Sequence, residues 1–283
     1  MNIRLSEKND INGMISLWNE AFGDAENEIC FFLDNKYISE NTLIIEENGK
    51  IASMLFLLEG NMRIKAVSYP SYYLYAACTA EEFRGRGFMA ELLAEANRIA
   101  FSRGKDFICL MPGEKSLFEF YEKHGYVTAF SKKILTVKRK DCDYSSEFRK
   151  IAVNDYQKLR NNAFSEFDYF EWDNRSVEFA FSHNRMYSGQ SLETCKGYVL
   201  YNIKDDTASV KEFAFADKNC MYGLSSLFSA SGCNKAVICL PVDYKSEIGE
   251  YEIAPSAMLY PVSDRSKSIA ATLKNAYLGL TLD

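Results

Sequence analysis

The chain has 283 residues, of which 47% are hydrophobic and 25% are charged, proportions typical of a folded globular protein and not of a disordered one. Its formal net charge of −6 argues against a nucleic-acid partner. No apolar run reaches the ~20 residues that a membrane-spanning helix needs. Two histidines are too few for a multi-histidine metal site.

The cysteines and the N-terminal residues bear on cellular location. Eight cysteines are scattered singly, without Cys-x-x-Cys spacing. The first seven residues lack the hydrophobic segment of a signal peptide. Reduced thiols therefore fit better than disulfides or zinc. The sequence predicts a cytoplasmic protein with no metal and no membrane partner.

The first half begins with helices and strands in an α+β order. A short strand is expected at 2–5, and a helix over 10–22 follows from apolar residues at 3.6 periodicity. A second helix is expected over 25–36. Two strands, 42–46 and 51–63, flank Asn48-Gly49, the strongest short signal for a hairpin.

The middle of this half contains the most informative motifs. A strand over 72–79 leads to the turn Arg84-Gly85-Arg86-Gly87-Phe88-Met89, which opens a helix over 88–103. A strand (107–111), a helix (116–124) and a closing strand (126–138) follow. Ser116, with Glu119 three residues later, predicts a capping box at the start of the second helix.

The second half repeats this order in outline. The patterns predict two helices, a hairpin, a further helix and a strand at 154–163, 175–184, 197–203 with 208–215, 221–229 and 236–240. The predicted linker is 138–147. The predicted fold is α+β, layered α/β/α around a mixed central sheet, with two tandem domains over 1–140 and 147–283. The second copy is degenerate, because residues 216–220 replace the glycine turn.

The glycine turn carries the first chemical signal. A tight turn at a helix N-terminus presents several free N–H groups to an anion, and two glycines let them converge without Cβ clashes. The sequence therefore predicts a site for a phosphate-bearing ligand at this turn.

Two motifs together resemble the GCN5-related N-acetyltransferase (GNAT) family. The turn matches that family's Gln/Arg-x-x-Gly-x-Gly/Ala signature, except that Met89 stands at the last position. The second motif, near the family's Phe-Tyr-x-x-x-Gly-Phe/Tyr ending, is Phe120-Tyr121-Glu122-Lys123-His124-Gly125-Tyr126. The tandem arrangement is similar to Eis-like acetyltransferases, without their third domain.

The resemblance implies N-acetyl transfer from acetyl-CoA to a primary amine of a small molecule or peptide, by direct attack in a ternary complex. Tyr121 would be the general acid that protonates the departing thiolate. The implied contacts with acetyl-CoA are Ala77, Cys78, Thr79, Arg84, Gly85, Arg86, Gly87, Phe88, Met89 and Ser116.

The general base is not identified, because the strand at 72–79 contains no glutamate. Glu20, Asp24 and Glu28 are candidates for holding the amine. The C-terminal Asp283 and a water relay are further alternatives.

Two other functions stay open. One is a catalytically weak or inactive acyl-CoA-binding regulatory protein, favoured by Met89 and by the missing base. The other is an acyltransferase that uses a longer acyl-CoA.

Overall fold

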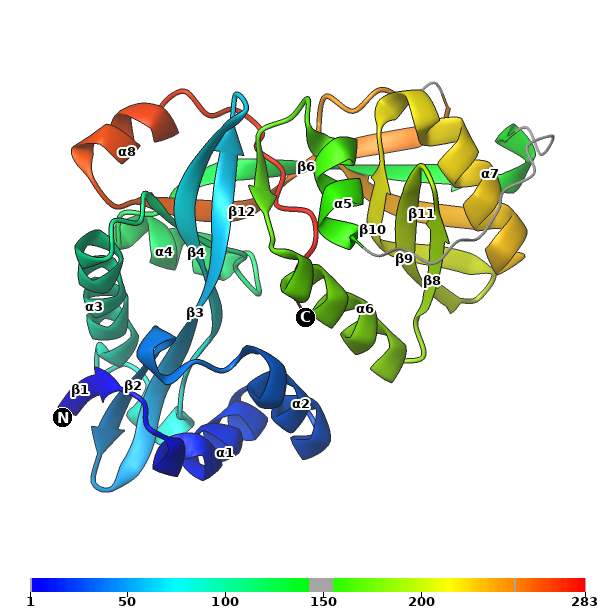
Figure 1. Ribbon diagram of the computed structural model, residues 1–283. Coiled ribbons are helices and arrows are strands. Elements are labelled where there is room, and N and C mark those ends of the chain that lie inside the picture. Colours follow the sequence, from blue (N-terminus) through cyan, green and yellow to red (C-terminus); the bar gives the residue numbers. More distant parts are fainter. Residues whose placement is uncertain (1, 143–154, 247, 283) are drawn as a thin grey trace. The chain divides into compact units, whose positions relative to one another are not determined.

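A computed structural model describes residues 2–142, 155–246 and 248–282 (Figure 1). Residues 143–147 of the linker predicted at 138–147, the first residue of the helix predicted at 154–163, and Asp283 lie outside the described residues. Within these ranges, no helix is long and apolar enough to cross a membrane.

The chain forms two compact units, and neither is continuous in sequence. The first unit comprises Met1–Gly60, Tyr69–Thr128 and Met258–Ala271. The second comprises Asn61–Ser68, Ala129–Ala257 and Thr272–Asp283. The domain boundaries 1–140 and 147–283 stay a prediction. The two units differ from them in three segments, because 61–68 and 129–140 belong to the second unit and 258–271 belongs to the first.

The first unit is a mixed sheet with helices. Its strands lie in the order β1-β2-β3-β4-β5-β12, with β4 and β5 parallel and β5 and β12 antiparallel. Its elements are β1 (Asn2–Leu5), α1 (Ile11–Phe22), α2 (Glu26–Lys36), β2 (Thr42–Glu47), β3 (Lys50–Ile64), β4 (Val67–Thr79), α3 (Phe88–Ser102), β5 (Phe107–Leu110), α4 (Ser116–Lys123), the end of β12 (Glu250–Pro261) and α8 (Asp264–Ala270).

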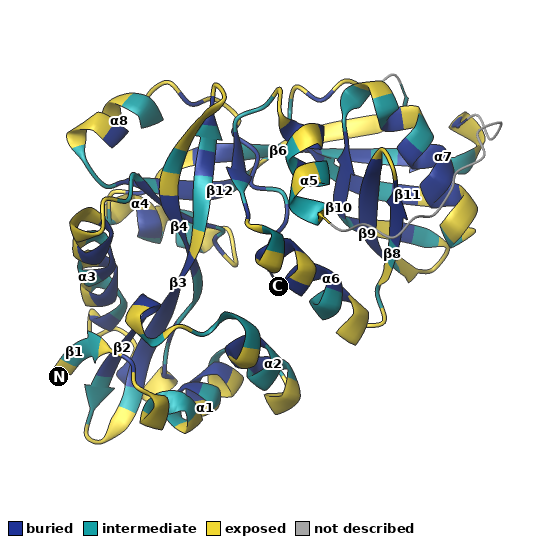
Figure 2. Ribbon diagram, in the orientation of Figure 1, coloured by how far each residue is buried: buried dark blue, intermediate teal, exposed yellow. Residues whose placement is uncertain are grey.

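The second unit repeats the mixed arrangement. Its strands lie in the order β6-β11-β10-β9-β8, with β10 and β11 parallel, and β7 pairs with the end of β3. Its elements are most of β6 (Val127–Lys138), α5 (Tyr156–Phe164), β7 (Tyr169–Glu171), α6 (Asn174–Met186), β8 (Gln190–Thr194), β9 (Gly197–Lys204), β10 (Thr207–Phe215), α7 (Cys220–Ser231), β11 (Lys235–Leu240) and the first part of β12. Figure 2 shows β9 and β10 largely buried.

The elements predicted from periodicity are confirmed in type and approximate position. The hairpin predicted at Asn48-Gly49 is also confirmed, because both residues have positive φ (54° and 73°), as the turns favoured in two-residue hairpins require. Asp205 and Asp206 join β9 to β10 in the same way, with φ of 47° and 64°.

The capping box predicted at Ser116 is wrong. Lys115 is the N-cap residue of α4 and already has helical dihedrals (φ −60°, ψ −35°), so Ser116 occupies the first helical position. From there the Ser116 hydroxyl donates a hydrogen bond to the Glu114 carboxylate and caps no amide of the helix.

A fully buried ion pair organises the core of the second unit. The Arg160 Nε donates to the Glu212 carboxylate at 2.9 Å, and both side chains have no exposed surface. Burying two charges is costly unless their remaining hydrogen-bonding groups also find partners. The other Glu212 oxygen accepts from the Tyr198 hydroxyl at 2.5 Å, and Arg160 also donates to the Phe170 and Leu278 carbonyls.

The same ion pair holds the C-terminal segment of the described chain. The Leu280 amide donates to Glu212 at 3.2 Å, and the Leu280 carbonyl accepts from the Trp172 indole at 2.9 Å. The segment around residues 278–280 is therefore fixed within the second unit by polar contacts that are sealed from water.

We expect Glu212→Gln to lower the free energy of unfolding by about 3 kcal/mol or more, because it leaves the buried Arg160 charge without its counter-ion. Urea denaturation of both proteins measures this difference. Glu252→Gln is the matched control: Glu252 is exposed on β12, and the change there is expected to stay within ~0.5 kcal/mol. Equal effects of the two substitutions would contradict this account of the ion pair.

Candidate functional site

The turn between β4 and α3 has the conformation that its glycines predict. Gly85 and Gly87 have φ of 74° and 81°, in the left-handed region that side-chain-bearing residues rarely adopt. Gly87 is the N-cap residue of α3. A Cβ added to either glycine would meet no atom within 4 Å, so the space beside the turn is open.

The backbone amides of this turn lack acceptors. Within the described part of the chain, no amide from 85 to 90 donates a hydrogen bond, and the first intrahelical bond of α3 runs from the Glu91 amide to the Gly87 carbonyl. Six consecutive donors at the positive end of a helix dipole attract an anion. The residues present therefore fit the pyrophosphate of a CoA ester.

The two arginines of the turn lie differently. Arg86 donates to the Glu47 carboxylate at 2.9 Å, and its guanidinium lies 4.7 Å from the centre of the Phe88 ring. Arg84 donates to the Thr79 carbonyl at 3.2 Å and forms no ion pair with a described residue. Arg86 thus anchors the turn, whereas the charge of Arg84 stays available to a ligand.

The strand that leads into the turn separates from its neighbour. The parallel register between β4 and β5 covers only residues 71–73, although β4 continues to Thr79. Ala76 lies just beyond the separation and has a φ of 47°. This conformation is costly for alanine and re-aims the backbone.

The opposite edge of β4 is held by β3. The Ser53 hydroxyl donates to the Cys78 carbonyl at 2.9 Å, and the Ala80 amide donates to the Ala52 carbonyl at 2.9 Å. Because successive residues of a strand direct their polar groups to opposite edges, the main chain of Ala77 and Thr79 faces the opening beside β5. An extended ligand can pair with that edge as an additional strand would.

Tyr121 projects from α4 into an aromatic cluster. Its ring centre lies 5.3 Å from that of Phe120 and 5.5 Å from that of Tyr126. Burial raises the pKa of Tyr121 to about 12. The Tyr126 hydroxyl is sealed from solvent without a hydrogen-bond partner among the described residues, whereas the Tyr121 hydroxyl is not sealed in this way.

Cys78 is a buried thiol at the end of β4. Burial first, and then the negative charge of Glu20, raise its pKa to about 12, which keeps the thiol protonated. A protonated thiol is a poor nucleophile, so this environment does not favour an acyl-cysteine intermediate. The charge of Glu20 is thus close enough to influence the end of β4.

The three carboxylates predicted as amine ligands differ in their contacts. Asp24 accepts from the Trp18 indole at 2.8 Å, and Glu28 accepts from the Ala25 amide at the start of α2. Glu20 accepts from the Glu81 amide at 2.7 Å, just before the glycine turn. Glu20 is therefore the member of this set placed closest in structure to the turn, and the other two stabilise local folds.

The structure adds one feature that the sequence pattern did not indicate. The positive φ of Ala76, and the strand separation around it, have no recognisable sequence signal, because alanine rarely adopts this conformation. Ser116 contacts Glu114, and its role toward a cofactor stays a prediction.

Residues 2–129 match the family model described as an acetyltransferase (GNAT) domain. This stretch belongs to the GCN5-related N-acetyltransferases, a family of acyltransferases. A search of curated protein sequences gives no match.

Solved structures share the fold of nearly the whole chain. A GCN5-related N-acetyltransferase from Anabaena variabilis ATCC 29413 has a TM-score of 0.78 at 13% identity, covering 94% of this chain and 74% of its own. A probable N-acyltransferase from Enterococcus faecalis V583 has a TM-score of 0.73 at 15% identity, covering 94% and 73%. Eis1 from Mycobacterium abscessus has a TM-score of 0.71 at 13% identity, covering 93% and 74%. At these identities the likeness is one of fold.

The corresponding position in the second unit lacks the turn. In the first unit, residues 84–87 separate the 3₁₀ turn Glu81–Phe83 from α3. In the second, the 3₁₀ turn Asp217–Asn219 leads directly into α7. The parallel register of β10 with β11 also ends early, at Val210, but the buried Tyr244 donates its hydroxyl to the Phe215 carbonyl at 2.8 Å. The strand end is thus already capped by a side chain.

The raised pKa of Tyr121 predicts a pH-dependent stability difference. The folded state holds the phenol proton up to about pH 12, whereas an unfolded tyrosine loses it near pH 10. The contribution of the protonated Tyr121 to the free energy of unfolding is therefore fully present below about pH 10, and it is lost as the pH rises toward 12. Relative to Tyr121→Phe, which cannot ionise, the wild type should lose about 1.4 kcal/mol between pH 9 and pH 11.

Urea unfolding of both proteins at the two pH values measures this difference. Parallel losses in the two proteins would show that Tyr121 does not titrate in a buried environment. The comparison cancels the contributions of the other buried tyrosines, which are present in both proteins.

Proposed function

We propose that the first unit binds acetyl-CoA and transfers its acetyl group to a primary amine by direct attack in a ternary complex. The observation that carries the proposal is the row of unpartnered amides at 85–90 beside the open edge of β4. One part accepts an anion and the other accepts an extended chain, which are the two features of a CoA ester.

Each residue has a separate task in the binding step. The amides of Gly85, Gly87 and Met89 and their neighbours bind the pyrophosphate, with Arg84 adding charge. Arg86 holds the turn against Glu47 and Phe88. The main chain of Ala77 and Thr79, on either side of Cys78, pairs with the pantetheine arm, and this orients the thioester.

The transfer step forms a C–N bond and breaks a C–S bond. The neutral amine nitrogen attacks the thioester carbonyl and forms the C–N bond, its proton passes to solvent water, and the sulfur leaves with the electron pair of its bond. We assign to Tyr121 the role of donating its hydroxyl proton to this sulfur. With a pKa of about 12, Tyr121 is a weaker acid than a thiol of pKa ~8.5. It therefore stabilises the thiolate first as a hydrogen-bond donor, and proton transfer follows as that sulfur is desolvated.

Glu20 is the residue we assign to holding the amine. Its carboxylate influences the end of β4 and accepts a hydrogen bond from the Glu81 amide, which fixes its position. The acceptor class is a cationic primary amine of a small molecule or peptide, because an anionic group at the site favours a cation.

Gly87→Glu should abolish binding of acetyl-CoA, because it places a side chain at positive φ and a negative charge among the amide donors. Isothermal calorimetry of the wild type should give one site per chain. Gly104→Glu is the matched control: Gly104 has a φ of 68° and open space at the other end of α3, so backbone strain is similar but the turn is intact.

Retained binding in Gly87→Glu, or equal loss in both variants, would place the ligand elsewhere. Two sites in the wild type would contradict the loss of the cofactor site in the second unit.

Tyr121→Phe should lower kcat for amine acetylation by about 10²–10⁴ while acetyl-CoA binding stays unchanged, as expected for loss of a proton donor. Thiol release followed with a chromogenic reagent measures the rate, and Phe120→Leu tests whether disturbed packing of the same aromatic cluster has the same effect. Equal, negligible rates in wild type and Tyr121→Phe would favour a CoA-binding regulatory protein.

A further inference from the structure

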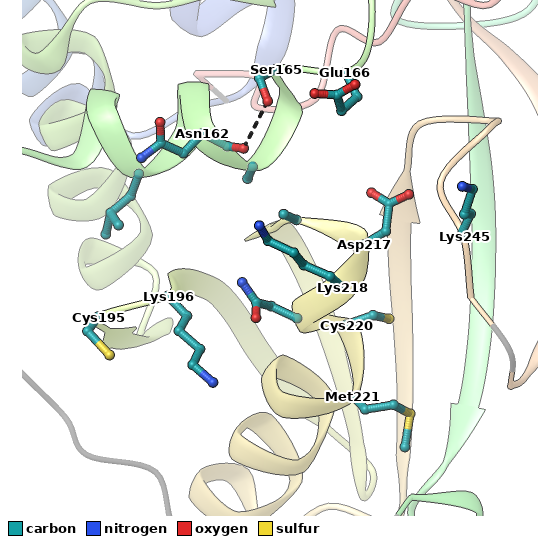
Figure 3. A pocket seen from close by; sticks show the side chains of 14 residues that line it. Asn162, Ser165, Glu166, Cys195, Lys196, Asp217, Lys218, Cys220, Met221 and Lys245 are labelled. Carbon is teal, nitrogen blue, oxygen red and sulfur yellow. Dashed lines mark hydrogen bonds between the residues drawn. The ribbon is translucent and has the colours of Figure 1, made fainter.

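A cavity of about 950 Å³ opens in the second unit where β10 gives way to α7 (Figure 3). Its walls come from α5, from the turn between β8 and β9, and from residues 216–221. Cavities that bind organic ligands typically measure ~300–1,000 Å³. The cavity is therefore large enough for an organic molecule of nucleotide size.

Three lysines and two carboxylates line this cavity, so its charged side chains leave an excess of one positive charge. Lys196, Lys218 and Lys245 come from three different segments and line the same space (Figure 3). Among the described residues, none of their ammonium groups forms an ion pair or donates a hydrogen bond. The Lys196 ammonium lies 4.3 Å from the centre of the Tyr222 ring, which directs this side chain without neutralising its charge.

The remaining lining is mixed and suits the organic part of a ligand. Leu159, Ala163 and Met221 supply apolar surface. The carboxylates of Glu166 and Asp217 also line the cavity, and Figure 3 shows both. Carboxylates accept hydrogen bonds from hydroxyl groups. A molecule with a phosphate group, an apolar ring and hydroxyls would find a partner for each part.

The cavity does not repeat the acetyl-CoA site of the first unit. The turn at its floor contains no glycine, and the Asn219 amide already donates to the Ala216 carbonyl at 2.7 Å. The neighbouring strand end is capped by Tyr244. Side-chain ammonium groups replace backbone amides as the anion-binding groups.

We propose that this cavity of the second unit binds an organic phosphomonoester of nucleotide size, with Lys196 and Lys218 contacting the phosphate. A phosphomonoester carries close to two negative charges at neutral pH and three acceptor oxygens, so it can accept from two ammonium groups at once. A monocarboxylate matches only one of the two charges.

Calorimetric titration of the full chain with inorganic phosphate and with adenosine monophosphate tests the proposal. The chain carries Gly87→Glu in every titration, so that the glycine turn of the first unit takes no phosphate. Adenosine monophosphate should bind at one site per chain, more tightly than inorganic phosphate. Its affinity should fall at least tenfold in the double variant Lys196→Gln, Lys218→Gln.

The control is the double variant Lys204→Gln, Lys235→Gln, which removes the same charge from exposed lysines of the same unit outside the cavity. Its affinity should match that of the parent. No binding of either probe, or equal weakening in both double variants, would overturn the proposal. Equal affinity for the two probes would contradict the claim that the cavity binds the organic portion of the ligand as well as its phosphate. Unchanged thermal unfolding midpoints show that the substitutions leave the fold intact.

Discussion

The separation of β4 from β5 after Tyr73 is the constraint on which the geometry of the candidate site depends. Main-chain N–H and C=O groups that leave a sheet still need partners. The main chain of Ala77 and Thr79 faces an opening instead of a strand, and the Thr79 carbonyl accepts from the Arg84 side chain. The left-handed Gly85 and Gly87 then leave a row of amides without acceptors among the described residues. Both parts of the site are therefore made of backbone. Side chains such as Arg86 stabilise its shape, which explains why Met89 in place of a small residue leaves the amide row intact.

In the second unit, a side chain of the unit itself occupies the corresponding separation between two strands. Its β10 leaves β11 after Val210, but Tyr244 supplies the missing hydrogen bond to Phe215, and no residues intervene between the 3₁₀ turn and α7. The unit keeps the fold because its core is held independently, by the Arg160–Glu212 pair and the chain segment bound to it. Absence of the glycine turn and preservation of the fold are thus separate physical matters.

Much of this could be predicted from local sequence signals. Helical and strand periodicity located the elements, and Asn48-Gly49 and the two turn glycines fixed backbone conformations that few other residues adopt. The predictions that were wrong, and the features that were missed, depend on the surrounding three-dimensional structure. Ser116 satisfied the capping pattern, but Lys115 is the N-cap residue and Ser116 is the first residue of the helix. Ala76 carries a conformation set by its neighbours. The exchange of strand segments between the two compact units, and the burial of Arg160 against Glu212, join residues far apart in sequence, which local patterns do not reveal.

The electrostatics near the end of β4 limit how an amine can react there. Cys78 at the end of β4 and Tyr121 in α4 are both neutral at physiological pH, and burial, which raises both pKa values to about 12, keeps them neutral well above it. Glu20 and Arg84 are the two charges that act on Cys78. A carboxylate attracts a protonated amine but also stabilises its charge, and the pKa values of a carboxyl (~4.3) and an alkyl amine (~10.4) differ by about six units, or ~8 kcal/mol. In the proposed mechanism, a carboxylate alone therefore binds the acceptor more readily than it deprotonates it. Loss of the amine proton requires desolvation of the ammonium group as the acceptor approaches the thioester, since burial disfavours its charged form.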